Sequence, residues 1–345
     1  MNFGILGSGS WGTALAKILT DNGNKIHWWN RSNAAIEQFK IRHHNPQYLS
    51  SAHFDISKLE LTSNAETVIK RSDVIVIAIP SAFTTEVLSS LDKNIFEGKK
   101  IISAIKGILP EQNVLLNDYL KEHFNVAIEN YFTVLGPCHA EEVAAEKLSY
   151  LTFTGVDEKS TAQISKAFKT TYINTIENRD IYGVQYAAVL KNIYAVGSGI
   201  AHGLDYGDNF LSVLIANSAD EMAGFLRKAG ILNAEVGYIE HKKSAGNELH
   251  NNYATSVYLG DLLVTCYSLF SRNRTFGNMV GKGYSVKAAQ LEMSMIAEGY
   301  NASKCMHILN QSIGADMPIA ETIYQILWQH IPANEGFKHI EANLV

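Results

Sequence analysis

The feature that most constrains the fold is a glycine-rich turn near the start of the chain, Gly7-Ser8-Gly9-Ser10-Trp11-Gly12. The apolar run Phe3–Leu6 precedes this turn, residues 13–19 follow it with helical spacing, and residues 25–29 form a second apolar run. Strand, glycine turn, helix and strand in this order are typical of a dinucleotide-binding unit. We therefore predict such a unit here. A purely structural glycine turn is the alternative.

Each glycine of the turn has a separate expected role. Gly7 permits a tight turn out of the strand, Gly9 lets the backbone approach a pyrophosphate, and Gly12 lets the helix pack closely on the strand. The helix N-terminus then offers N–H groups and a partial positive charge to the phosphates. The motif therefore predicts NAD or NADP as the cofactor.

The residues after the second strand bear on the choice between these two cofactors. This strand ends in Trp28-Trp29-Asn30-Arg31, roughly 20 residues beyond the glycines, where an NAD-specific site usually has an acidic residue. No acidic residue is present in this stretch, and Arg31 is able to pair with a 2′-phosphate. The pattern favours NADP or tolerance of both cofactors, and a solvated arginine is the alternative.

Composition excludes several classes of function. The chain has 345 residues, 46% hydrophobic and 18% charged, which predicts two folded domains. Its formal net charge of -5 argues against a general nucleic-acid binder. The cysteines Cys138, Cys266 and Cys305 lack metal-ligand spacing and suit a reducing compartment. No apolar run is long enough to span a bilayer, and we expect no signal peptide. We therefore expect a cytoplasmic protein without a metal site or a membrane insertion.

The first half of the chain alternates between strand and helix patterns. Apolar runs predict strands at residues 73–79, 100–105, 131–135, 150–155 and 172–177. Helical patterns occupy residues 33–40, 66–71, 81–91 and 112–123, and residues 42–57 form a polar loop that contains His43 and His44.

The continuous apolar run before Pro80 indicates a parallel strand that is buried on both faces. Ser81 is the expected N-cap of the helix that follows this strand. Ligands of such sheets bind outside the carboxyl ends of the strands, so residues 80–83 are expected to line the cofactor groove.

Strand patterns stop at about Arg179, and long apolar helices continue to the end of the chain. We predict a nucleotide-binding domain at residues 1–178 and a helical substrate-binding domain at residues 179–345. Because no flexible linker joins them, an interdomain cleft is expected to hold the site.

One lysine, Lys191, lies within the nearly all-apolar helical segment 186–196. Burial lowers the pKa of a lysine from roughly 10.4 towards neutrality, and such a lysine can exchange a proton with an alcohol oxygen. The alternative is a lysine whose ammonium reaches solvent at the helix edge. Asp261, in another apolar segment, is its expected ion-pair partner.

Residues Ser271, Arg272 and Asn273 together offer hydroxyl, guanidinium and amide donors, a set that suits a phosphate. Taken alone, such a cluster also occurs in solvated turns. Lys106, followed by Gly107 at the end of a predicted strand, is placed to meet an anionic ligand.

The order of these motifs resembles the bacterial-type NAD(P)-dependent glycerol-3-phosphate dehydrogenases along essentially the whole chain. The segments that carry the resemblance are residues 7–16, Lys106-Gly107, Gly136-Pro137, Leu190-Lys191-Asn192 with Gly197 and Gly199, Leu259-Gly260-Asp261-Leu262 with Thr265-Cys266, Ser271-Arg272-Asn273-Arg274 with Phe276-Gly277, Ala297-Glu298-Gly299 and Met317-Pro318-Ile319.

The resemblance implies an α/β protein with an N-terminal Rossmann domain and an all-α C-terminal domain like that of 6-phosphogluconate dehydrogenase. It implies reversible reduction of dihydroxyacetone phosphate to sn-glycerol 3-phosphate, for phospholipid synthesis, by a homodimer without a metal. The implied cofactor contacts are Gly7, Gly9, Ser10, Trp11, Gly12, Arg31, Lys106, Gly136, Ala140, Arg272, Ile296 and Glu298. The implied substrate contacts are Lys106, Gly136, Cys138, Lys191, Asp261, Ser271, Arg272 and Asn273. Lys191 is the implied proton donor and acceptor, with Lys106 polarising the substrate oxygen and Asp261 holding Lys191.

Two stretches depart from the family pattern. The family commonly has Thr or Ser and then Phe after the Gly-Pro pair, where this chain has Cys138-His139, and a thiol is a poorer hydrogen-bond donor. Residues 238–256 also depart from the glycine- and alanine-rich approach to Gly260, and a solvated insertion is the expected reading.

Two other functions remain open on the residues alone. A related dehydrogenase of another hydroxy or keto acid fits the cofactor motifs, but it does not need the Ser271–Asn273 cluster. A dinucleotide-sensing protein without turnover does not need an acid–base lysine at position 191.

Overall fold

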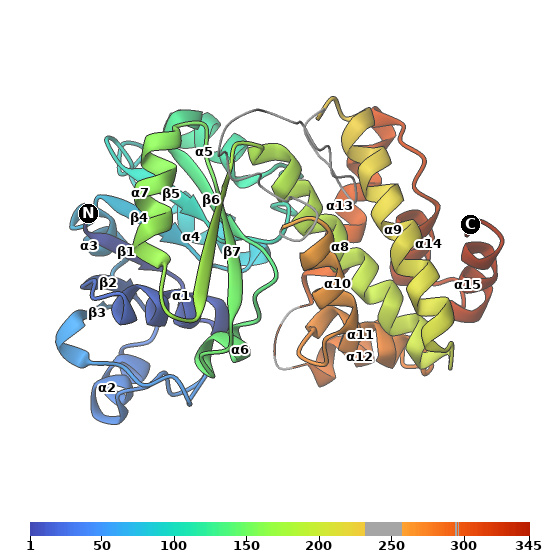
Figure 1. Cartoon of the computed structure of the whole chain (residues 1–345), viewed down its shortest axis with the longest axis horizontal. Coiled ribbons are helices and arrows are strands. Elements are labelled where there is room, and N and C mark those ends of the chain that lie inside the picture. Colours follow the sequence, from blue (N-terminus) through green and yellow to red (C-terminus); the bar gives the residue numbers. More distant parts are fainter. Residues whose placement is uncertain (232–256, 294, 296) are drawn as a thin grey trace, which may run out of the picture. The chain divides into compact units, whose positions relative to one another are not determined.

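The computed structural model describes residues 1–231, 257–293, 295 and 297–345, which form two compact units (Figure 1). The first unit contains Met1–Ile105 and Val114–Ile181, and the second contains Lys106–Asn113 and Tyr182–Val345. Residues 106–113 therefore lie within the sequence of the first unit but pack with the second.

The described residues of the first unit form an eight-stranded sheet in the order β3-β2-β1-β4-β5-β6-β7-β8. The strands are β1 (Phe3–Leu6), β2 (Ile26–Trp29), β3 (Leu59–Thr62), β4 (Val74–Ile77), β5 (Lys100–Ser103), β6 (Tyr131–Leu135), β7 (Ser149–Thr154) and β8 (Ile173–Asn178). The helices are α1 (Ser10–Asp21), α2 (Asn33–Arg42), α3 (Ala65–Lys70), α4 (Ser81–Ser89), α5 (Leu116–Phe124), α6 (Ala140–Ala144) and α7 (Glu158–Phe168), with 3-10 turns η1 (Ile56–Lys58) and η2 (Ile128–Asn130).

The first six strands are parallel and follow the Rossmann order, with a switch point between β1 and β4. The predicted Rossmann domain is therefore confirmed. Both β1 and β4 are buried along their whole length, as their continuous apolar runs predict. Gly7 follows β1 directly, which places the glycine turn at the carboxyl edge of the sheet.

The sheet is not parallel throughout, because β7 runs antiparallel to β6. A parallel return needs a crossover helix that spans the length of a strand. The only helix between these strands, α6, has 5 residues and a length of about 7.5 Å, against about 20 Å for the 6 residues of β7. The longer α7 restores a parallel crossover from β7 to β8.

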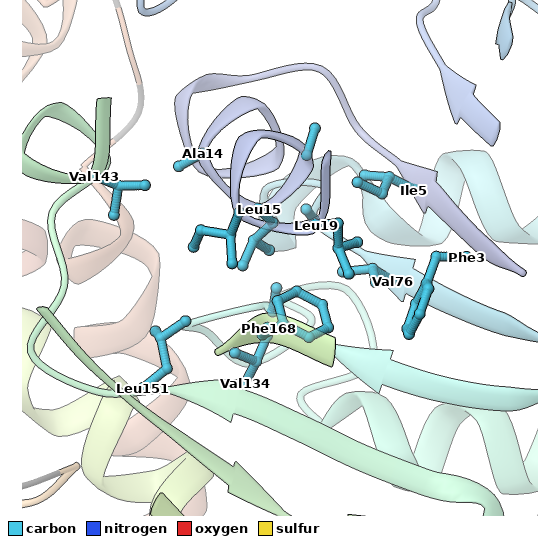
Figure 2. Close-up of a cluster of buried hydrophobic side chains, with 14 of the residues drawn as sticks. Phe3, Ile5, Ala14, Leu15, Leu19, Val76, Val134, Val143, Leu151 and Phe168 are labelled. Carbon is cyan, nitrogen blue, oxygen red and sulfur yellow. The ribbon is translucent and has the colours of Figure 1, made fainter. Parts of the chain in front are cut away.

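A cluster of buried apolar side chains holds α1 and α7 against the sheet (Figure 2). Leu15 and Leu19 of α1 point into it, and Phe3 of β1 meets Phe168 of α7 edge-to-face with ring centroids 5.8 Å apart. Burial of such side chains contributes about 1.5–3 kcal/mol each, so this cluster fixes the helix that follows the glycine turn.

The second unit is helical in all of its described regular structure, as predicted. Its elements are α8 (Ile181–Gly203), α9 (Asp208–Lys228), α10 (Leu259–Tyr267), α11 (Arg272–Gly281), α12 (Val286–Glu292), α13 (Glu298–Ile313), α14 (Pro318–Tyr324), the π-helical turn η4 (Gln325–Gln329) and α15 (Ala333–Glu341). Among the described helices, none combines the length and the apolar character needed to cross a membrane.

Helices α8 and α11 approach backbone to backbone through glycines. A Cβ at Gly199 would lie 2.1 Å from the Arg274 carbonyl oxygen, and one at Gly277 would lie 2.0 Å from the Val196 carbonyl oxygen. No larger residue fits either position without moving a helix. This contact brings the start of α11 close to the middle of α8.

Three expectations for local structure need correction. Ser81 is the first residue of α4 rather than its N-cap, which is Pro80 and makes no side-chain cap hydrogen bond. Helix α5 begins at Leu116 rather than residue 112. The edge strand β3 was not expected: its residues Leu59-Glu60-Leu61-Thr62 do alternate between apolar and polar, but the strand has only 4 residues, too few for this pattern to stand out.

Candidate active site

The glycine turn has the geometry that a dinucleotide requires. Gly7 has φ +121°, and a Cβ there would lie 2.4 Å from the Ala78 carbonyl oxygen. A Cβ at Gly12 would lie 2.3 Å from the Gly7 carbonyl oxygen, so the helix approaches the strand only because Gly12 has no side chain. At Gly9 nothing lies within 4 Å of the Cβ position. The open space beside Gly9 fits the close approach of a pyrophosphate to the backbone.

The helix after this turn begins with Gly9 as N-cap and without a side-chain cap. Its first residues, Ser10 and Trp11, are buried and half-buried respectively. A helix N-terminus of this kind offers its backbone donors and dipole to an anion. The residues present therefore fit the phosphates of NAD or NADP.

Arg31 is exposed just beyond the carboxyl end of β2. Its neighbour Asn30 is 7% exposed and accepts a hydrogen bond from the Ser32 backbone N–H at 3.1 Å, so its carbonyl oxygen serves the backbone. Ser32 in turn caps α2 by accepting from the Ala35 backbone N–H. The guanidinium of Arg31 therefore extends from a fixed turn.

Gly136, Cys138 and Ala140 lie together after β6. Gly136 has φ +129°, and a Cβ there would lie 2.9 Å from the Tyr150 carbonyl oxygen, so glycine is required. Ala140 opens α6. Cys138 is a free cysteine, 4% exposed, in the hydrophobic cluster of the first unit.

In the second unit, Lys191 on α8 forms an ion pair with Asp261 on α10 (both helices are labelled in Figure 1). The two residues are 2% and 1% exposed, so the pair predicted from sequence is present and fully buried. The Thr265 hydroxyl donates to the Asp261 backbone carbonyl at 2.6 Å and approaches the Asp261 carboxylate oxygen Oδ1 at 3.4 Å. The ammonium therefore holds the carboxylate, while the Thr265 hydroxyl proton goes chiefly to the backbone carbonyl.

Burial lowers the pKa of Lys191 from its ordinary value of 10.5 to about 8, because the ammonium loses its hydration. The negative charge of Asp261 opposes this shift, whereas the positive charge of Lys106 adds to it. Lys191 is thus able to gain and lose a proton near neutral pH. Lys106 itself is half-buried, just after the carboxyl end of β5.

Two buried asparagines connect the lysines to the start of α11. Asn192 donates to the Lys106 backbone carbonyl at 2.8 Å, and its carbonyl oxygen accepts from the Asn273 side chain at 2.8 Å. The Asn273 carbonyl oxygen accepts from the Gly299 backbone N–H at 2.9 Å. Because each amide group is satisfied at both ends, this chain fixes the backbone at Lys106 against α8, α11 and α13.

The three predicted phosphate-binding residues differ in whether their side chains already make hydrogen bonds within the protein. The Ser271 hydroxyl caps α11 by accepting from the Arg274 backbone N–H, and Asn273 holds the amide chain. Arg272 is half-buried in the first turn of α11. Of the three, Arg272 extends a charged group from the positive end of a helix, which suits an anion.

Some predicted positions lie at the edge of what the structure describes. Glu298 is the first residue of α13, with Ala297 as N-cap. Ile296 and the segment 238–256 lie outside the described residues.

Sequence reasoning missed Asn192 as a member of the site, although it follows Lys191 directly. The available signal was a second polar residue in an otherwise apolar helix, since a buried amide needs partners of its own. Its partners lie 81 and 86 residues away in the chain, so sequence spacing does not identify them.

Comparison with known families gives a match over both halves of the chain. Residues 2–161 match the family model described as NAD-dependent glycerol-3-phosphate dehydrogenase N-terminus, and residues 180–338 match the corresponding C-terminus model.

Named relatives match along nearly their full length. The glycerol-3-phosphate dehydrogenase [NAD(P)+] of Staphylococcus carnosus is 32% identical over 341 residues, covering 97% of this chain and 96% of the relative. That of Macrococcus caseolyticus is 30% identical over 338 residues, with the same coverage.

Solved structures share the fold. A glycerol-3-phosphate dehydrogenase from Coxiella burnetii superposes with a TM-score of 0.86 at 24% identity, covering 99% of this chain and 98% of that chain. A D-mandelate dehydrogenase has a TM-score of 0.58 at 13% identity, covering 97% of this chain and 99% of that chain, so the architecture extends to other dehydrogenases.

Proposed function

Because the chain belongs to the NAD-dependent glycerol-3-phosphate dehydrogenase family, we propose that it interconverts dihydroxyacetone phosphate and sn-glycerol 3-phosphate. It is an NAD(P)-dependent oxidoreductase. The observation that carries the chemistry is the buried Lys191–Asp261 pair, in which Lys191 has a pKa of about 8.

The glycine turn holds the pyrophosphate of the cofactor in this proposal. Ser10 and Trp11 present the start of α1 to the phosphates, and Arg31 meets the adenosine ribose or its 2′-phosphate. The cofactor contacts that the resemblance implies on the nicotinamide side, at Gly136, Ala140, Ile296 and Glu298, belong to this proposal. When bound, the cofactor supplies or accepts the hydride.

Lys191 acts as general acid in the reducing direction and as general base in the oxidising direction. Negative charge grows on the carbonyl oxygen as the ketone is reduced, and a fixed ammonium stabilises that charge before donating its proton. Lys106 adds a second positive charge at the same oxygen. Asp261 keeps enough positive charge on buried Lys191 for the acid form to exist at neutral pH, since its carboxylate raises the pKa.

The substrate phosphate is bound at the start of α11. Arg272 supplies the guanidinium, and Ser271 and Asn273 define the shape of the site. Gly136 and Cys138 contribute further substrate contacts. We also propose residues 1–178 as the NAD(P)-binding domain and residues 179–345 as the helical substrate-binding domain, with single residues of each contributing to the other's ligand.

We also propose the setting of the reaction. The protein acts in the cytoplasm as a homodimer and supplies glycerol 3-phosphate for phospholipid synthesis. This setting is what the resemblance to the bacterial-type family implies. Sedimentation of the purified protein at micromolar concentration tests the dimer, and a monomer at that concentration would contradict it.

The test of the reaction compares dihydroxyacetone phosphate with unphosphorylated dihydroxyacetone, following loss of NADH or NADPH absorbance. The wild type is expected to turn over the phosphate ester strongly and the free ketone weakly. Arg272→Ala should raise KM for the phosphate ester by about 30-fold or more, because one charged partner is lost. The free ketone should be affected far less. An equal effect on both substrates would remove Arg272 from the phosphate site.

A further inference from the structure

The first two carbonyl groups of the glycine turn are each held by a distant side chain. The Trp28 indole N–H donates to the Gly7 carbonyl at 2.9 Å, and the Asn45 amide donates to the Ser8 carbonyl at 2.9 Å. Trp28 comes from β2, and Asn45 comes from the loop after α2. Both donor side chains are 1% exposed, and the bond to Gly7 is buried whereas the bond to Ser8 is part-buried.

The third carbonyl is held from within α1. Thr13 donates to the Gly9 carbonyl through its hydroxyl at 2.9 Å and through its backbone N–H at 2.9 Å. The Asn45 amide also donates to the Thr13 hydroxyl oxygen at 2.8 Å. Asn45 therefore links the second and third carbonyls through a single amide group.

Fixing these carbonyls also fixes the N–H groups of the turn. A trans peptide unit is planar, with its C=O and N–H on opposite sides. The carbonyls of Gly7, Ser8 and Gly9 belong to the same peptide units as the N–H groups of the residues that follow them. Each N–H therefore points away from its clamped carbonyl, and the partial negative charges are kept from an anion beside the turn.

Asn45 is itself held rigidly. Its side-chain carbonyl accepts from the backbone N–H groups of Gln47 at 3.0 Å and Tyr48 at 3.2 Å. Its loop is thereby folded back on the turn that it clamps. A surface loop residue without a structural task has no need of four such bonds.

Apart from its hydrogen bond to Gly7, Trp28 is fixed by aromatic packing. Its ring lies 5.3 Å from that of Phe39 and 5.7 Å from that of Phe54, centroid to centroid. Phe39 belongs to α2, and Phe54 lies in the same loop as Asn45. The two clamps therefore share one supporting segment, residues 33–57.

We propose that Asn45 is a positioning residue for the cofactor pyrophosphate, acting with Trp28 to orient the N–H groups of the glycine turn. This inference rests on the proposed cofactor site. The loop after α2 is recognisable in the sequence only as a polar segment. In this proposal its residue Asn45 supports cofactor binding indirectly, by orienting the turn rather than by contacting the phosphates.

Asn45→Ala tests this proposal by competition of ADP and of adenosine against NADH, measured by fluorescence titration. The variant is expected to raise Kd for ADP about tenfold, since one or two buried hydrogen bonds to the turn are lost. Adenosine has no phosphates, and its Kd should change by less than about twofold. Trp28→Phe keeps the aromatic packing but removes the N–H donor. This variant should also raise the Kd for ADP.

Asn24→Ala is the matched control. Asn24 also donates its side-chain amide to a backbone carbonyl, that of Leu19 at 3.1 Å, but beyond the C-terminal end of α1. The Asn24→Ala variant should bind ADP with the same Kd as the wild type. In kinetics, Asn45→Ala should raise KM for NADH more than it lowers kcat at saturating NADH, whereas general unfolding would lower kcat for every substrate.

Three results would overturn the inference: an unchanged Kd for ADP, an equal loss for ADP and adenosine, or an equal loss in the Asn24 variant. The proposed reaction and this inference can fail separately. If Asn45→Ala weakens ADP binding as expected but the wild type does not turn over dihydroxyacetone phosphate, the proposed reaction is overturned and this inference stands.

Discussion

The pH dependence of the reaction should have opposite signs in its two directions, because one buried lysine serves both. Reduction needs Lys191 protonated, so kcat/KM for dihydroxyacetone phosphate should fall as pH rises above about 8. Oxidation needs Lys191 neutral, so kcat/KM for glycerol 3-phosphate should rise with pH and level off above about 8.

The magnitude follows from the pKa of Lys191. With a pKa of about 8, roughly a tenth of Lys191 is neutral one unit below that pH. An ordinary lysine with a pKa of 10.5 would have about 300-fold less of the base form there. The buried setting on α8 is therefore worth a gain of about 300-fold in available base for the oxidising direction.

The assay is kcat/KM in both directions across the pH range, for the wild type and for Asp261→Asn. Removing the carboxylate leaves desolvation unopposed, so both limbs should move to lower pH by about 1–3 units. Asp21→Asn is the matched control: Asp21 also pairs with a buried lysine, Lys17, at 2.7 Å, but on α1. Limbs with the same sign in both directions, or limbs that Asp261→Asn does not move, would refute this role of Lys191.

Three further predictions concern Arg31, the contribution of the Lys191–Asp261 pair to stability, and Glu221. Arg31→Ala should raise Kd for NADPH by about 10-fold or more, with little effect on NADH, in fluorescence titration. Lys191→Met should lower the free energy of unfolding in urea by about 3–5 kcal/mol, and adding Asp261→Leu should restore most of this stability without restoring turnover. Glu221→Gln should destabilise, because the Glu221 carboxylate accepts two backbone N–H bonds at the start of α14. Burial raises the pKa of Glu221 from 4.5 to about 7, so wild-type stability falls as pH rises through this range. The difference in free energy of unfolding between the wild type and the Gln variant, measured in urea, should therefore shrink by about 3 kcal/mol between pH 4.5 and about 7.

The parts of the fold that could be predicted are those whose signal is local. The apolar runs at β1 and β4 are continuous because both faces of each strand are buried, and glycine at position 7 is needed for its positive φ. Strand direction is not a local property. The antiparallel direction of β7 follows from the shortness of α6, which has 5 residues. No sequence signal indicates that this helix ends so early.

The candidate site divides along the same line. Lys191 and Asp261 were recognisable because a charged side chain within an apolar helix needs a partner of opposite charge. Each of the two residues is that partner for the other. Asn192 carries no charge, and an amide in a helix is common enough to pass unnoticed. Its role emerges only when the close glycine contact between α8 and α11 brings Asn273 within hydrogen-bonding distance.

Asn45 extends this reasoning to the cofactor side. A sequence motif records the residues whose own geometry is special, such as Gly7 and Gly12, but not the residues that hold them. Trp28 and Asn45 act on backbone carbonyls, which every residue possesses, so nothing in the turn itself reveals that a partner is required. Donors of this kind are found by asking where the carbonyls of a functional turn are satisfied, because buried backbone groups are rarely left without a partner. The same question, put to the Lys106 carbonyl, identifies Asn192.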